Sequence, residues 1–141
     1  MKRFTRCVCL LLVMAITLVI PAYAVEGRAS NYFWSSSVYL YKLSGTTFEA
    51  WFSVDAVGIM DELGASVIKI QRSSDGENWM TMRTYTKGGY SNLICKDTGC
   101  HASYITYTGV SGYYYRAFYI LYAKDSNGSA EAYWYSAPIL L

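Results

Sequence analysis

The chain has 141 residues, of which 53% are hydrophobic, 16% charged and 17% aromatic. This composition excludes an intrinsically disordered or collagen-like chain, and the length excludes a large multidomain enzyme. The formal net charge of +2 at pH 7 gives no reason to expect nucleic acid as a partner.

The N-terminal segment has the pattern of a secretory signal peptide. Three bases stand in the first six residues, 14 uncharged residues follow from Cys7 to Ile20, and Ala22-Tyr23-Ala24 forms a small-x-small site. The alternative is an uncleaved membrane anchor. A helix of that length rises about 21 Å, however, which is less than the roughly 30 Å of a hydrocarbon core. We therefore expect residues 1–24 to be removed after Ala24 and residues 25–141 to be secreted.

Cleavage would also change the charge of the protein. The lost bases leave nine Lys and Arg against ten Asp and Glu, a net charge of −1. Binding to nucleic acid or to a membrane surface is therefore not expected of residues 25–141. We expect an extracellular partner, either a protein or a polysaccharide, and no cofactor.

Short strands separated by turns account for most of the remaining sequence. Alternation of apolar and polar residues predicts strands at residues 37–43, 47–55, 65–72, 79–85, 104–108, 112–124 and 129–136. Met60-Asp61-Glu62-Leu63 is expected to interrupt the pattern with a single helical turn. Seven strands from about residue 37 to residue 136 predict an all-β fold, a single antiparallel immunoglobulin-like β-sandwich.

Two turns have clear signals in the sequence. Asp75-Gly76 predicts a tight turn after the strand at 65–72, and Trp79 is expected to pack over it. Asn127-Gly128 predicts the last hairpin. Asn127-Gly128-Ser129 also fits a glycosylation sequon, but we interpret these residues as the hairpin turn.

Cys95 and Cys100 are the two cysteines that would remain after cleavage. An even count in an exported protein favours a disulfide, and the residues between them, which include Asp97 and Gly99, suit a tight turn. So short a loop would be stabilised by roughly 2 kcal/mol. Free thiols are one alternative. A metal site with His101 is the other, but it lacks a clear fourth ligand, and no metal is expected.

Several motifs in the second half of the chain occur in a familiar order. Ile68-x-Ile70-x-x-Ser73-x-Asp75-Gly76-x-x-Trp79 precedes Tyr113-x-Tyr115-Arg116-Ala117, which Asn127-Gly128 follows. This set resembles the C-strand, penultimate strand and last hairpin of a fibronectin type III or related immunoglobulin-like sandwich. The resemblance implies that Tyr113 forms a tyrosine corner, with its hydroxyl bonded back to the chain. The whole chain also resembles small signal-bearing proteins of unknown function from Gram-positive bacteria.

Aromatic residues are the unusual feature of this sequence. Residues 25–141 contain 22 of them, more than the interior of a small sandwich needs. Alternation along 112–124 points Tyr113, Tyr115 and Tyr119 inward, with every second residue outward. The residues that would then share one outer face are Tyr114, Arg116, Phe118, Tyr122, Tyr133 and Tyr135.

This outer face has two interpretations. Tyrosine is a good strand former, and cross-strand aromatic pairs stabilise a sheet by roughly 0.2–1 kcal/mol each. An exposed aromatic face is also typical of a contact surface. We expect a non-catalytic protein-binding or structural module that uses this face, which could equally serve self-association. A carbohydrate-binding module is the alternative.

Catalytic motifs are not found in the sequence. His101 is the single histidine, and no nucleophile elbow, P-loop or H-E-x-x-H motif is present. Adjacent acids such as Asp61-Glu62 cannot flank a glycosidic bond as hydrolases require. We therefore expect no catalytic residues. The least favoured alternative is a small metal-dependent hydrolase that uses His101, Asp97 or Asp61.

Overall fold

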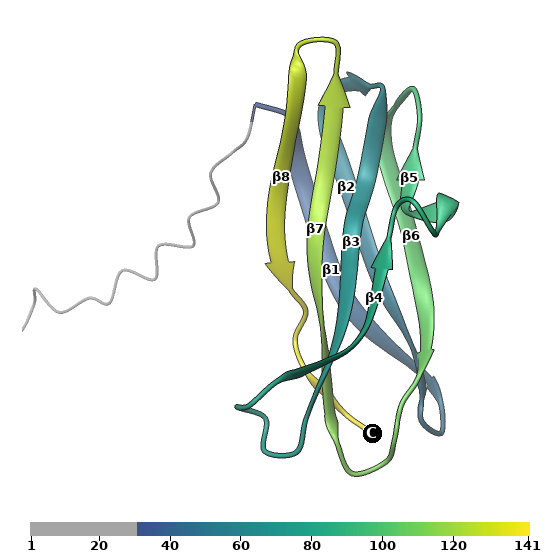
Figure 1. Ribbon diagram of the computed structural model, residues 1–141. Coiled ribbons are helices and arrows are strands. Elements are labelled where there is room, and N and C mark those ends of the chain that lie inside the picture. The colour runs from purple at the N-terminus through teal and green to yellow at the C-terminus, as the bar shows by residue number, and fades with distance from the viewer. Residues whose placement is uncertain (1–30) are drawn as a thin grey trace, which may run out of the picture.

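The computed structural model describes residues 31–141 as two antiparallel β-sheets that face each other across one hydrophobic core (Figure 1). The first sheet has the order β1-β2-β6 and the second the order β4-β3-β7-β8, with β5 beside β3 and β9 beside β7. The first sheet contains β1 (Phe33–Ser44), β2 (Thr47–Met60) and β6 (Thr98–Thr108). The second contains β3 (Glu62–Ser73), β4 (Met80–Thr86), β5 (Ile94–Cys95), β7 (Tyr114–Asp125), β8 (Gly128–Tyr135) and β9 (Ile139–Leu140). A single 3-10 turn, η1 (Ser91–Leu93), precedes β5.

The predicted all-β, antiparallel fold is confirmed, but the predicted count of seven strands is wrong. The structure has nine strands in residues 31–141. The two additional strands, β5 and β9, have two residues each, which is too short to show an alternating pattern. The expected signal peptide, residues 1–24, lies outside the described residues.

The helical turn expected near Met60 is also wrong, because this segment carries the chain from one sheet to the other. Met60 ends β2 and pairs with Thr98, whereas Leu63 in β3 pairs with Ala123. Backbone groups that a helical turn would use are therefore engaged in sheet ladders. Asp61 is the one residue between the two strands.

Core residues follow the alternation predicted for the central strands. The fully buried side chains of β2, β3 and β7 include Phe48, Phe52, Val54, Ile68, Ile70, Tyr115, Tyr119 and Leu121. Each of the aliphatic and phenylalanine side chains among them contributes about 1.5–3 kcal/mol by leaving water. The Tyr119 hydroxyl also donates a hydrogen bond of 3.4 Å to the Tyr39 carbonyl, which links β7 to β1 across the sandwich.

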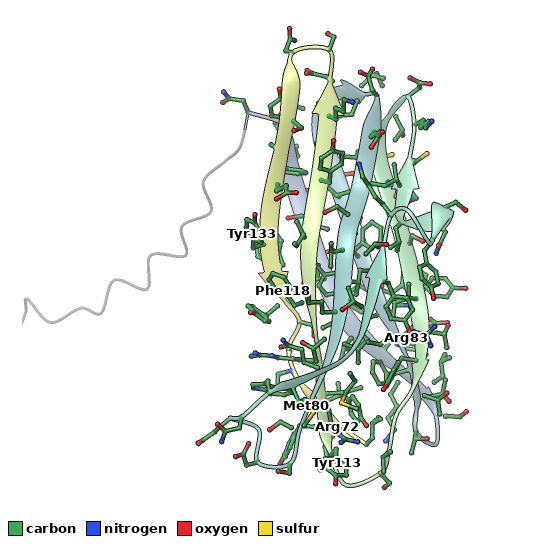
Figure 2. The ribbon with its side chains drawn as sticks, in the orientation of Figure 1. Arg72, Met80, Arg83, Tyr113, Phe118 and Tyr133 are labelled. Carbon is green, nitrogen blue, oxygen red and sulfur yellow. The ribbon has the colours of Figure 1, made fainter. Side chains whose placement is uncertain are left out.

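The hydrogen bond between a tyrosine hydroxyl and the chain that was expected of Tyr113 is found at Tyr115. The buried Tyr115 hydroxyl accepts a hydrogen bond from the Val110 N–H at 2.8 Å. Tyr113 instead lies beside Arg72, whose Cζ is 4.4 Å from the ring centroid (Figure 2). Tyr113 precedes β7, so it stays at the end of the sandwich, and Tyr115 is the first inward tyrosine within the strand.

The predicted hairpin at Asn127-Gly128 is confirmed. Asp125 and Gly128 face each other at the closed end of the β7–β8 pair. The Asp125 carboxylate accepts hydrogen bonds from the N–H groups of Asn127 and Gly128 at 2.8 and 3.1 Å. The side chain thereby satisfies backbone donors that the turn leaves unpaired.

Candidate functional site

The outer face of the sheet β4-β3-β7-β8 carries the aromatic residues that the sequence predicts there. β7 lies between β3 and β8, and its inward residues are fully buried while its outward residues are partly exposed. On β8, Tyr133 and Tyr135 are 62% and 54% exposed. Tyr115 and Tyr119 therefore face inward, and Phe118, Tyr133 and Tyr135 face outward, as the alternation predicts.

Phe118 is the aromatic centre of this face. It pairs in register with Tyr135, and the two ring centroids lie 4.9 Å apart. Its ring is also stacked with Tyr133, at 6.2 Å and with an interplanar angle of 16°. Figure 2 shows Phe118 and Tyr133 close together along the β7–β8 pair. Lys69, the register partner on β3, places its Nζ 5.9 Å from the Phe118 centroid.

Arg116 lies two residues before Phe118 on the same outward side of β7. Its Cζ is 4.4 Å from the ring centroid of Trp79 and 4.4 Å from that of Tyr135. Its Nε donates a hydrogen bond of 2.8 Å to Oε1 of Gln71, its register partner on β3. Trp79 follows β3 and Tyr135 ends β8, so the guanidinium contacts rings from two different segments of the sheet.

Trp79 reaches Arg116 because the turn before it is tightly bonded. The Asp75 carboxylate accepts hydrogen bonds from the N–H of Glu77, the N–H of Asn78 and the Asn78 side chain at 2.6–2.9 Å, and a further one from Ser73. These bonds, first those from Asn78, hold the pKa of Asp75 well below its ordinary value. Gly76 has a φ of +78°, which glycine adopts without strain. The predicted Asp75-Gly76 turn is confirmed, and it positions Trp79.

We call the group of side chains gathered on this face the Arg116 cluster. Its members are Lys69, Gln71, Trp79, Arg116, Phe118, Tyr133 and Tyr135. Three of these, Lys69, Gln71 and Trp79, were not expected in the contact face. Lys69 and Gln71 occupy alternate positions of the strand predicted at 65–72, opposite the buried Ile68 and Ile70, so the sequence could have placed them on the outer face. No sequence signal shows the direction in which the side chain of a turn residue such as Trp79 points.

Two residues expected in the contact face lie at its ends instead. Tyr122 is four residues beyond Phe118, about 13 Å along the strand, and its ring lies 3.9 Å from Lys87 Nζ. Lys87 in turn forms an ion pair of 2.7 Å with Glu62, which lowers the pKa of Glu62. Tyr114 lies at the other end, beside the turn at Gly76. Neither joins the Arg116 cluster.

The Arg116 end of the cluster is cationic. The one ion pair within residues 31–141 joins Lys87 to Glu62, so no described carboxylate is paired with Arg116 or Lys69. Glu131 approaches the cluster only at Tyr133, whose hydroxyl donates to it at 2.8 Å. This hydrogen bond raises the pKa of Tyr133. The Arg116 Nη groups have no protein acceptor in the described part of the chain.

A second aromatic row, which the sequence analysis missed, crosses the outer face of the sheet β1-β2-β6. Tyr39, Trp51 and Tyr104 are direct register partners on the three strands. Trp51 is stacked with Tyr104 at 4.4 Å and with Tyr39 at 6.2 Å. The Trp51 Nε1 donates a hydrogen bond of 2.7 Å to Glu49. The alternation within each strand points each of these side chains outward. Their alignment in one row depends on how the three strands pair, which alternation does not show.

The disulfide expected between Cys95 and Cys100 is not present, because both residues are free thiols in the structure. Cys95 pairs with Leu63 in one sheet, whereas Cys100 pairs with Asp55 in the other. The turn between them, in which Asp97 has a φ of +52°, crosses from sheet to sheet and does not bring two cysteines together in one ladder. Nearness in sequence was therefore a poor guide to pairing here.

His101 has a structural setting in β6. Its Nε2 is 2.9 Å from the Asn92 carbonyl, and its ring lies against Phe52 at 5.6 Å. Across residues 31–141, no three His, Cys, Asp or Glu side chains are grouped so as to hold a metal ion. The same residues include no helix with the length and apolar character needed to cross a membrane.

No protein-family model, curated protein or solved structure matches the chain. Its function must therefore be inferred from the residues and geometry of the two sheet faces.

Proposed function

We propose that this protein is a secreted, immunoglobulin-like binding module without catalytic activity, which contacts a partner protein through the Arg116 cluster. One observation carries the proposal: an arginine on the outer sheet face lies against two aromatic rings and has no acidic partner in residues 31–141. Arginine, tyrosine and tryptophan are the residues that dominate the binding energy of protein interfaces.

The strand order supports the immunoglobulin-like part of the proposal. β3, β7 and β8 adjoin in the order of strands C, F and G of such domains, with β4 beside β3 as a strand C′ would be. β1, β2 and β6 adjoin as strands A, B and E would. Domains of this architecture recur in cell-surface proteins, and in variable domains the loops at one end of the sandwich form the binding site.

A comparison of the two aromatic faces shows why the Arg116 cluster is the better contact surface. In the row Tyr39, Trp51 and Tyr104, the rings stack on each other and the indole N–H is bonded to Glu49, so the polar groups are satisfied within the protein. In the Arg116 cluster, two rings lie against the guanidinium, and its Nη donors have no acceptor among the described residues. Sheet stabilisation accounts for the first arrangement but not for the second.

The binding proposal can be tested without knowing the natural partner. Random displayed peptides are selected on the immobilised protein, and the affinity of the selected peptides is then measured by fluorescence titration. Replacing both Phe118 and Tyr135 with alanine should weaken binding by at least about tenfold, as expected for central interface residues.

The matched control replaces Tyr39 and Tyr104 with alanine on the opposite sheet. This control should bind the selected peptides as the wild type does, with both variants checked for folding by circular dichroism. Failure to select any peptide, or peptides whose binding is lost only in the control, would contradict the proposal.

Export is tested separately with the full chain expressed in a secreting host. N-terminal sequencing of protein from the medium should begin at Val25. Protein that stays in the cells with an intact N-terminus would contradict secretion while leaving the binding proposal standing.

Polysaccharide binding is a second candidate, and the row of Tyr39, Trp51 and Tyr104 favours it. Three aligned aromatic rings, two of them more than 40% exposed, form an apolar ridge across three strands. Tryptophan fluorescence should then change saturably with one soluble polysaccharide, and the change should disappear in Trp51→Ala. An unchanged spectrum across plant, mucin and cell-wall polysaccharides would eliminate this candidate.

A further inference from the structure

We infer that Arg116 is the receptor for a carboxylate on the partner protein, an Asp or Glu side chain set among apolar or aromatic residues. The inference rests on the proposed function and adds the chemistry of the ligand to it. It follows from the hydrogen-bond donors of Arg116, from the groups that hold its guanidinium and from the charges around it.

The guanidinium of Arg116 has its donors only partly used. An arginine side chain carries five N–H groups in one plane. Nε donates to Gln71, and the four N–H groups on the two Nη atoms have no acceptor in residues 31–141. The rings of Trp79 and Tyr135 both lie against the guanidinium, each with its centroid 4.4 Å from Cζ. The edge formed by the two Nη atoms therefore remains for a ligand.

The same contacts prepare this edge for binding. Gln71 and the two rings fix the orientation of the guanidinium before any ligand arrives, so less side-chain entropy is lost when a ligand binds. Two parallel N–H groups match the two oxygens of a carboxylate, and such bidentate, charge-assisted pairs are among the strongest hydrogen bonds in proteins.

Charge and surroundings favour a carboxylate over a phosphate. Phosphate groups on partner proteins are recognised by several arginines together, whereas Arg116 is the single arginine of its cluster and Lys69 lies over Phe118. A single negative charge matches one guanidinium. The flanking Phe118, Tyr133 and Tyr135 would pack against apolar or aromatic neighbours of that acidic residue.

The test uses two blocked tripeptides that differ in one group, N-acetyl-Tyr-Glu-Tyr-amide and N-acetyl-Tyr-Gln-Tyr-amide. Titrations are followed by NMR at the Nε–H of Arg116 and the indole N–H of Trp79. We expect saturable shifts of both signals with the Glu peptide and at least about fivefold weaker binding of the Gln peptide, because a charged pair is replaced by a neutral one. Added salt should reduce this difference.

Variants then assign the difference to Arg116. In Arg116→Lys, which keeps the charge but loses the planar pair of donors, the preference for Glu should fall to about twofold or less. Gln71→Ala should reduce it partly. Arg83→Ala is the control, since this arginine donates to Tyr90 on another part of the surface, and it should keep the full preference.

The possible results separate this inference from the proposed function. Equal binding of both peptides with shifts in the cluster would overturn the carboxylate inference and leave the cluster as a contact face. A preference for Glu that survives in Arg116→Lys would also overturn it. Absence of shifts with either peptide, together with failure of the displayed-peptide selection, would overturn both.

Discussion

The carbonyl oxygen of Leu93 occupies the place where a side chain on Gly64 would begin. A Cβ at Gly64 would overlap that oxygen and also approach the His101 ring at 3.0 Å, and the Gly64 φ of +152° disfavours any other residue. We expect Gly64→Ala to lower the free energy of unfolding by more than about 2 kcal/mol, because backbone must move to make room. Urea unfolding measures this. Gly88→Ala, with open space around it, should stay within about 0.5 kcal/mol of the wild type.

Replacing Tyr115 with phenylalanine should lower the free energy of unfolding by about 1 kcal/mol. The change leaves the Val110 N–H without the acceptor that it has at 2.8 Å. Tyr113→Phe removes a hydroxyl two residues away and keeps the ring beside Arg72, so it should be nearly neutral. Equal losses in the two variants, measured by chemical denaturation, would contradict a stabilising role for the Tyr115 hydrogen bond.

The hydrogen bonds to Asp75 predict a dependence of stability on acid. Because its pKa is lower in the folded state than the ordinary 3.8, its contribution is complete above about pH 4 and is lost as the pH falls further. The wild type should therefore have a higher melting temperature than Asp75→Asn at neutral pH, and the difference should shrink below about pH 4. Asp97→Asn, in a turn without these hydrogen bonds, should follow the wild type. Parallel profiles for wild type and Asp75→Asn would refute the prediction.

The burial of Tyr119 predicts that stability also depends on pH in the alkaline range, where it should fall as the pH rises. Burial raises its pKa above the ordinary 10.0, so its contribution to stability is complete below about pH 10 and is lost as the pH rises further. At pH 7, Tyr119→Phe should lose less than about 1 kcal/mol, since the bond to Tyr39 is long at 3.4 Å. Above pH 10 the wild type should lose stability faster than Tyr119→Phe. The exposed Tyr41→Phe serves as the control and should behave as the wild type throughout.

The faces of the strands could be predicted from the sequence because side-chain direction has a period of two residues. The alternation along β7 separates Arg116 and Phe118 from the buried Tyr115 and Tyr119, and the structure confirms it. The alternation of inward and outward side chains within one strand is a local property. It needs no knowledge of which strands are neighbours.

Contacts between distant segments could not be predicted in this way. Trp79 joins the cluster through the conformation of a turn, and Tyr39 meets Trp51 and Tyr104 only through the pairing of three strands. Cys95 and Cys100 are five positions apart in sequence but belong to different sheets. Predicting these contacts requires the arrangement of all the strands, which the local patterns of one sequence do not give.

The passage of the chain through Asp61 has a consequence for how the molecule opens. β2 is the middle strand of one sheet, β3 is an inner strand of the other, and one residue joins them. Because the link between β2 and β3 is so short, one sheet cannot move away from the other without displacing an inner strand of that other sheet. Slow amide exchange should therefore be lost from both sheets in a single event, and a ligand held on one face should protect amides on the opposite face as well.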